Sequence, residues 1–102
     1  MSTIPTMHEA RDYLRIIGSD LDPALAIAIL AAHAEIDGFI GGDPSGDRWP
    51  TPEDVPGDVK AAGLMLTRCH FEEGDGEQAE LWRSIAQKLL VRYRVDSGLS
   101  AA

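Results

Sequence analysis

Apolar residues recur at helical spacing in four segments of the chain, and stretches rich in glycine, proline or acidic residues separate these segments. The first segment places its apolar side chains three or four positions apart, at Met7, Ala10, Leu14 and Ile17. This spacing puts them on one side of a helix. Thr6 is expected to cap its start, with Glu9 closing a capping box, and Gly18 is expected to end it.

The second segment predicts a helix that begins at Asp22 and runs to about Ile40. Asp22 is the expected N-cap, because its carboxylate can accept a hydrogen bond from the free amides of the first turn. Pro23 suits the first helical position. Gly41 and Gly42 are expected to stop the helix, since glycine readily adopts the left-handed conformation found at helix C-termini.

The remaining two helices are predicted at about residues 57–73 and 77–90. No alternating run of apolar and polar residues and no Asn-Gly turn indicates a strand. We therefore predict an all-α fold, a small four-helix bundle with a long loop between the second and third helices. The helical domain covers residues 1–95, and residues 96–102 have the composition of a flexible tail.

The helices differ in how much of their circumference is apolar. The fourth is two-faced, and its apolar side consists of Leu81, Trp82, Ile85, Ala86, Leu89 and Leu90. The second and third are apolar on most sides. Behind the main stripe of the second helix lie Ile27, Leu30, Ala31 and Ala34. The candidates for the core or for self-association are Ile29, Ile36, Leu64, Leu66 and Phe71.

A helix with apolar residues on most sides is either central in its domain or buried against a partner. A domain of 102 residues has room for one central helix rather than two. The pattern therefore favours self-association of the chain. The alternative is that the excess alanine reflects high helix propensity and tolerates contact with water.

The loop of residues 41–56 is the first candidate partner interface. It is far longer than the usual connection between packed helices, and it contains Arg48 and Trp49. Tryptophan is frequent among the residues that dominate binding energy at protein interfaces, so Trp49 is a candidate anchor for a partner. The alternative is that Trp49 folds back as a lid on the helical core.

The second candidate interface is the segment “VRYR”, which supplies Arg92, Tyr93 and Arg94. It follows the last apolar position of the fourth helix, so we expect it to lie outside the packed bundle and to dock a partner protein. Arginine and tyrosine are both favoured at such interfaces. The alternative is that Tyr93 packs onto the first helix and the arginines neutralise the helix C-terminus.

Composition and charge narrow the class of protein. Hydrophobic residues make up 44% of the chain and charged residues 25%, which is typical of a globular domain. The net charge of −8 argues against a protein that mainly grips nucleic-acid phosphates. The single cysteine excludes an internal disulfide framework and fits a reducing compartment. We expect no membrane span and no signal peptide.

The sequence contains no recognisable catalytic or metal-binding pattern. Cys69 and His70 are neighbours that point about 100° apart on a helix, and no spacing brings His33 to them. The segment “GGDPSG” lacks the Lys-Ser/Thr ending of a phosphate loop. Asp20 and Asp22 lack the further ligands of a calcium loop. We therefore expect no enzyme activity, no cofactor and no metal.

Four segments in a fixed order carry a family resemblance. They are “EARDYLRI” (9–16), “LDPALAIAILAAHAEIDGFIG” (21–41), “VPGDVKAAGLMLTRCHFEE” (55–73) and “IAQKLLVRYRV” (85–95). Together they resemble the small head–tail connector (adaptor) proteins of long-tailed bacteriophages and gene transfer agents. The third segment is similar to the hallmark of that family, a Pro-started helix with Lys-Ala and aliphatic residues that ends in an aromatic residue followed by Glu.

The resemblance extends over residues 7–95, with one departure. After Phe71 and Glu72 the family commonly has Asn-Arg-Glu, whereas this chain has Glu73, Gly74 and Asp75. A contact that this arginine would make in relatives is therefore not carried over to this chain.

The resemblance implies a structural virion protein. Its copies would form a ring that matches the dodecameric portal protein and lies beneath it, extending the DNA channel. The ring would offer a docking face to the next head–tail connector or tail-completion protein, and genome DNA would pass through without sequence-specific binding. The implied location is the head–tail interface of the virion, after assembly in the cytoplasm of the bacterial host, with no membrane involved.

The alternative function is a small helical regulator of transcription or of a protein partner. A DNA-recognition helix needs basic residues near its N-terminus. The helix with the clearest polar face begins instead among acids, at Glu77 and Glu80. The sequence therefore favours the structural role.

Overall fold

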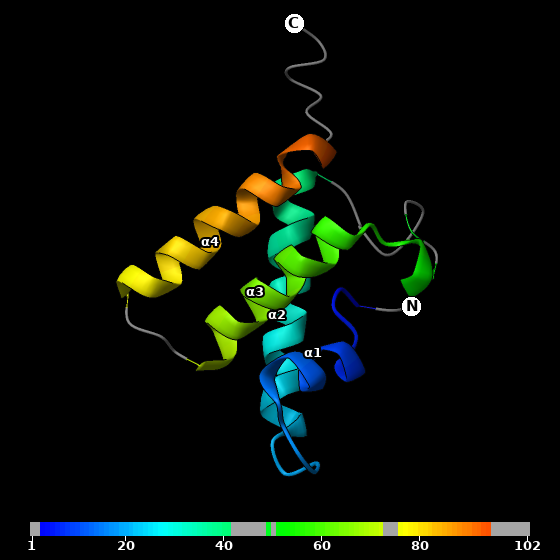
Figure 1. Ribbon diagram of the computed structural model, residues 1–102, viewed down its shortest axis with the longest axis vertical. Coiled ribbons are helices and arrows are strands. Elements are labelled where there is room, and N and C mark those ends of the chain that lie inside the picture. The colour runs from blue at the N-terminus through cyan, green and yellow to red at the C-terminus, as the bar shows by residue number, and fades with distance from the viewer. Residues whose placement is uncertain (1–2, 42–48, 50, 73–75, 95–102) are drawn as a thin grey trace, which may run out of the picture.

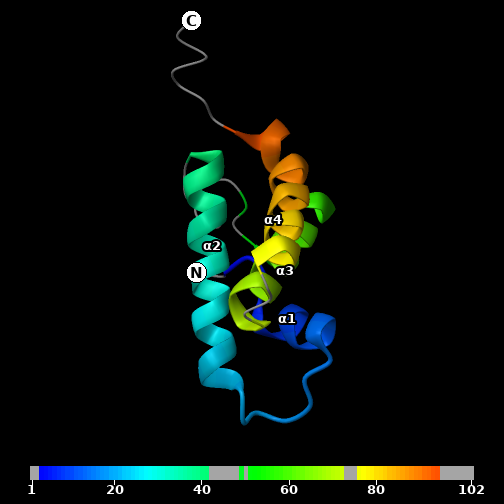
Figure 2. The same cartoon turned by 90° about the vertical axis from the view of Figure 1, so that its left-hand side faces the viewer.

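The computed structural model describes residues 3–41, 49, 51–72 and 76–94, and this part of the chain is all-α. Its elements are α1 (Met7–Leu14), α2 (Asp22–Ile40), the 3₁₀ turn η2 (Pro52–Asp54), α3 (Gly57–Glu72), α4 (Gly76–Leu90) and the 3₁₀ turn η3 (Val91–Tyr93). In Figures 1 and 2, α2 forms one layer of the molecule, and α1, α3 and α4 form the other. The prediction of a small all-α four-helix bundle is confirmed.

Helix α1 starts as predicted but ends early. The amide of Glu9 donates to Oγ1 of Thr6 at 3.2 Å, and the amide of Thr6 donates to Oε1 of Glu9 at 3.0 Å, so the capping box is present. The helix ends at Leu14, because Arg15 adopts the left-handed conformation with φ of 58°. The expectation that Ile17 continues the apolar stripe is therefore wrong, and its side chain is 97% exposed.

Helix α2 has the predicted bounds but not the predicted N-cap. Leu21 occupies the cap position, and no side chain caps the first turn. The carboxylate of Asp22 instead accepts two hydrogen bonds from the terminal nitrogen of Arg11, at 2.6 and 2.7 Å. Asp22, which was expected to cap its own helix, thus joins α2 to α1 through Arg11. Gly41 ends the helix as expected, with φ of 81°.

Helix α3 is the central helix of the domain and packs against α1, α2 and α4. Its residue Leu66 belongs to the larger core cluster, which consists of Ile4, Ala32, Ile36, Ile40, Val55, Val59, Ala62, Leu66, Ala86 and Leu90. A smaller cluster joins α1 to the start of α2 and consists of Ala10, Leu25 and Ile29, with half-buried Phe71 against it. Ile29, Ile36 and Leu66 are thus core residues of the single chain. Leu64 is half-buried.

The residues before α1 fill a gap between α2 and α3. Ile4 and Pro5 are buried, and the amide of Ile4 donates to Nδ1 of His33 on α2 at 3.1 Å. An added Cβ at Gly63 of α3 would meet atoms of both residues at 3.1 to 3.2 Å. A glycine at this position therefore allows the close approach of this segment. The spacing of apolar residues in the sequence did not predict this contact of Ile4 and Pro5 with α2 and α3.

Helix α4 lies at the edge of the second layer and buries only part of its apolar side. Ala86 and Leu90 are buried, whereas Leu81 is 57% exposed and Ile85 is also exposed. The two-faced pattern of the sequence placed all of these residues on one apolar side. The buried line is rotated toward Ala86 and Leu90, because α4 contacts mainly α3 and covers little of α2.

By length and composition alone, helix α2 is long and apolar enough to cross a membrane. This finding differs from the expectation that the sequence contains no membrane span. Core helices of globular proteins pass the same test. Here the inner side of α2 packs against the other three helices. It also carries Glu35, which forms ion pairs with the side chains of two other helices.

Candidate partner interfaces

The two aromatic residues of the predicted interfaces lie against each other. The rings of Trp49 and Tyr93 meet edge to face, with centroids 5.7 Å apart and planes at 79°. Both pack on the larger core cluster. The hydroxyl of Tyr93 donates to Oδ1 of Asp58, in the first turn of α3, at 2.7 Å. This hydrogen bond to the carboxylate raises the pKa of Tyr93 above its usual value.

The expectation that “VRYR” lies outside the packed bundle is therefore wrong for Tyr93. Its ring closes the core at the end where α2 and α4 finish, and its partner helix is α3 rather than the first helix. Trp49 is half-buried against the same cluster, which is the lid arrangement. Both rings thus pack on the core of the single chain, and both side chains are half-buried.

A chain that ends after Val91 should be less stable than the full chain. It loses the edge-to-face contact with Trp49 and the hydrogen bond from the Tyr93 hydroxyl to Asp58, while the Val59 amide still donates to the same carboxylate. We expect the melting temperature to fall by roughly 5 °C or more. Thermal unfolding followed by circular dichroism measures it, with a chain ending after Arg94 as control. An unchanged melting temperature for the shorter chain would show that Tyr93 is not structural.

The arginines of the same segment are exposed. The guanidinium of Arg92 lies 3.8 Å from Oδ2 of Asp58 and stacks over the ring of Tyr93. That of Arg94 lies over the ring of Phe39, on α2, at 5.0 Å from its centroid. Arg48, the remaining predicted interface residue, lies outside the described residues. The described members of the two predicted interfaces therefore gather at one end of the molecule.

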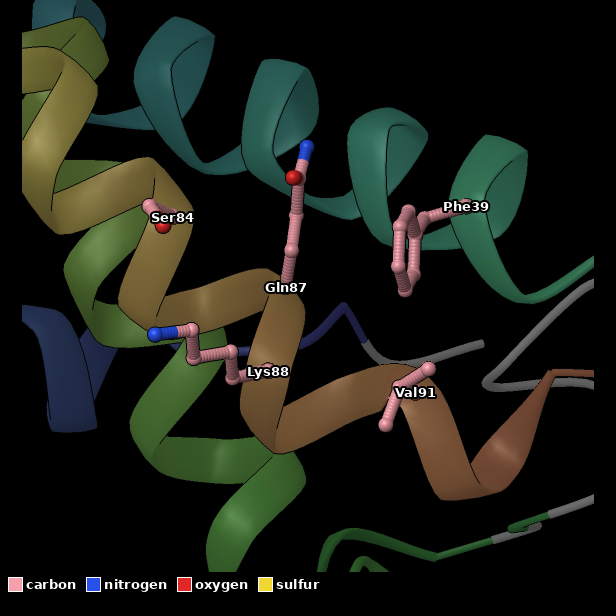
Figure 3. A pocket seen from close by; sticks show the side chains of 5 residues that line it. All are labelled: Phe39, Ser84, Gln87, Lys88 and Val91. Carbon is pink, nitrogen blue, oxygen red and sulfur yellow. The ribbon is translucent and has the colours of Figure 1, made fainter.

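A groove opens at this end between the last turns of α2 and α4. It has a volume of about 460 Å³ and is lined by Phe39, Ser84, Gln87, Lys88 and Val91. Figure 3 shows Phe39 projecting from α2 toward α4. No lining residue is acidic, and no carboxylate among the described residues pairs with Lys88 or Arg94. The groove thus has an apolar floor and a basic rim, which the sequence pattern did not indicate.

The outer face of α2 is a second exposed apolar surface. Ile27 is 69% exposed and Leu30 is 59% exposed, and the neighbouring small residues Ala24, Ala34 and Gly38 are exposed as well. This face points away from the other layer (Figure 2). Ile27 and Leu30, which the sequence pattern places behind the main apolar stripe, are both uncovered in the structure. The exposed Leu81 and Ile85 belong to α4, in the other layer.

Glu35 ties three helices together, and sequence reasoning did not single it out. Its carboxylate, on α2, accepts hydrogen bonds from Nε and a terminal nitrogen of Arg83 on α4, the latter at 3.1 Å. Nε2 of His70 on α3 lies 2.9 Å from the same carboxylate. Burial acts to raise the pKa of Glu35, but the hydrogen bonds from Arg83 and His70 outweigh it and hold the pKa below 4.5.

The candidate nucleophile and metal ligands occupy structural positions. Cys69 is buried and its thiol donates to the carbonyl of Ala79 at 3.6 Å, and burial raises its pKa. Nδ1 of His33 accepts a hydrogen bond from the amide of Ile4, and Nε2 of His70 lies 2.9 Å from the carboxylate of Glu35. Within the described ranges, no group of three or more His, Cys, Asp or Glu side chains is placed to hold a metal ion.

Comparisons of the chain with protein-family models, with curated protein sequences and with solved structures found no match. The resemblance to head–tail connectors therefore stays a prediction from the sequence.

Proposed function

We propose that this protein is a structural virion component, a head–tail connector that forms a ring beneath the portal. The ring would extend the DNA channel and present a docking face to the next connector or tail-completion protein. The observation that supports the proposal is the exposed apolar surface of α2. Ile27 and Leu30 project from a helix whose other side is already in the core.

Such a surface favours burial against protein. Each large aliphatic side chain gains roughly 1.5–3 kcal/mol when it leaves water, so two exposed neighbours on one helix face favour association. The exposed Leu81 and Ile85 lie on a different helix, in the other layer. Two dissimilar apolar surfaces suit a ring, because a head-to-tail contact joins different patches of neighbouring copies.

The charge of the chain is compatible with a channel. DNA phosphates are repelled by a negative surface, so a chain with net charge −8 would let DNA pass rather than retain it. The described acids at the helix starts, such as Asp58 and Glu77, are also unlike the basic N-terminus of a recognition helix. These features support a conduit over a transcription regulator.

The proposal predicts that many copies bind each portal ring. The purified protein is mixed with its cognate portal protein, and mass photometry counts the copies in the complex. We expect a full ring for the wild type. We expect much reduced occupancy for Leu30→Asp, because a buried charge would replace an apolar contact.

The matched control is His8→Asp, at an exposed position of α1. This variant adds negative charge without touching the outer face of α2, so it should bind as the wild type does. Both variants must keep wild-type helicity. Portal rings that carry a single copy, or none, of the wild-type chain would refute the proposed function.

A further inference from the structure

The connection between α1 and α2 exposes an apolar side chain almost completely. Ile17 is 97% exposed, and Leu21, four positions later, is about half exposed. Gly18 turns the chain there with φ of 86°, so Ile17 points away from both helices rather than back to the core. The same connection carries Asp20, which is also exposed. It therefore presents an isoleucine beside an acid to solvent.

The groove at the other end of α2 has the complementary chemistry. Phe39 and exposed Val91 provide an apolar floor, and Lys88 lies on the rim (Figure 3). Arg94 adds a second cation over the Phe39 ring. In a chain with net charge −8, two cations beside an apolar groove, with no described carboxylate paired to either, favour an acidic segment with an apolar side chain.

We infer that the α1–α2 connection of one copy docks in the α2–α4 groove of the next. Ile17 fills the space over Phe39 and Val91, and Asp20 faces Lys88 and Arg94. The inference rests on the proposed function and deepens it, because it names the surfaces that join neighbouring copies. It adds a second pair of patches to the head-to-tail contact, in addition to the exposed apolar residues of α2 and α4.

The geometry makes the contact intermolecular. The connection precedes the first turn of α2, and the groove residue Phe39 lies in its last turn. A helix of 19 residues separates these two ends by about 28 Å, and they lie far apart in Figure 1. A contact between two different patches is heterologous, so it can be repeated from copy to copy. Such a contact gives a ring when the rotation between copies closes.

Cross-linking tests the pairing directly in the full chain. All variants carry Cys69→Ala, so that the introduced thiols are the only ones. Chains with Ile17→Cys are mixed with chains with Val91→Cys at high concentration and treated with a short bismaleimide. Cysteine is itself a small apolar side chain, so these substitutions weaken the apolar contact but do not remove it. We expect heterodimers in this mixture, and few dimers when either chain is treated alone, because like ends do not meet.

The control replaces Val91→Cys with Glu53→Cys, an exposed position on η2 outside the groove. This pair should give much less cross-linked dimer, because η2 lies outside the groove and the two introduced thiols stay apart even when the chains associate. Equal yields for the two pairs, or no dimer from the Ile17 and Val91 pair, would overturn the inference. Circular dichroism of each variant verifies that it is folded.

Charge reversal tests the polar part of the contact. Lys88→Glu in the Val91→Cys chain should lower the yield of heterodimer about tenfold. Asp20→Lys in the Ile17→Cys chain should restore much of it, since the pair is then reversed rather than broken. A loss with Lys88→Glu that Asp20→Lys does not restore would show that Asp20 does not face Lys88 and would overturn the pairing.

The outcomes for the contact and for the function are separate. Selective cross-linking in a chain that does not bind portal would support the head-to-tail contact and refute the connector role. A full ring on the portal without selective cross-linking there would support the connector role and refute the contact. If Lys88→Glu prevents even single copies from binding portal and no cross-link forms, the groove receives the portal instead, and the inference is wrong.

Discussion

Leu66→Ala is expected to lower the free energy of unfolding by about 2–5 kcal/mol. The Leu66 side chain is 1% exposed and lies in the larger core cluster of the central helix, where it packs with residues of the other helices and of the N-terminal segment. Truncation leaves a cavity that the surrounding helices cannot fill without moving. A domain of this size has roughly 5–15 kcal/mol in total, so the loss is large.

Chemical denaturation with urea measures the effect of Leu66→Ala, and the slope of the transition verifies that the unfolded states are comparable. Leu64→Ala is the matched control, since it removes the same atoms from a half-buried position two residues earlier on α3. Leu64→Ala should lower the free energy of unfolding clearly less than Leu66→Ala does. Equal costs for the two substitutions would remove Leu66 from its central place in the core.

Glu35→Gln is expected to lower stability by about 1–3 kcal/mol at neutral pH. The substitution keeps the size of the side chain but removes the negative charge that Arg83 and His70 share, and it leaves the Arg83 guanidinium without its carboxylate. Three helices meet at this carboxylate, so its loss affects the packing of both layers. Urea denaturation at pH 7 measures the change.

The same carboxylate should contribute to acid sensitivity. Its folded pKa lies below 4.5, so its contribution is complete above about pH 4.5 and is lost as the pH falls through the folded value. Stability of the wild type should therefore drop more steeply below pH 4.5 than that of Glu35→Gln. The pKa of Glu9 is also lowered, so both proteins should retain part of the slope.

The matched control is Glu72→Gln, which removes a carboxylate paired with Arg68 one turn earlier on the same helix. Exposed pairs of this kind contribute little, so stability should change by less than about 0.5 kcal/mol. If Glu35→Gln is as mild as Glu72→Gln and has the same pH profile as the wild type, the three-helix contact is not stabilising.

The sequence by itself determined the elements of this protein. Capping boxes, glycine at helix ends and the three- and four-residue spacing of apolar side chains act within one or two turns of a helix, so local pattern was sufficient for them. The capping box of Thr6 and Glu9, the C-terminus of α2 at Gly41 and the extent of α3 followed in this way. The same spacing also placed Leu66 and Ile36 in the core.

The early end of α1 did not follow from the pattern. Arg15 takes a conformation that favours glycine, three residues before the glycine that was expected to end the helix. Asp22 likewise pairs with Arg11 instead of capping its own helix. For Asp22 a contact between helices outweighed the local preference, and such contacts have no fixed spacing in the sequence.

Only the tertiary structure decided which apolar surfaces remain exposed. Helices α2 and α3 have similar patterns, yet α3 lies between three helices while the outer face of α2 is uncovered. The groove beside Phe39 and the ion pairs of Glu35 each bring together residues that are more than ten positions apart in the sequence. The exposure of Ile17 depends on where α1 ends. Periodicity gives the direction of each side chain around its own helix, but the neighbour that it meets is set by how the helices cross.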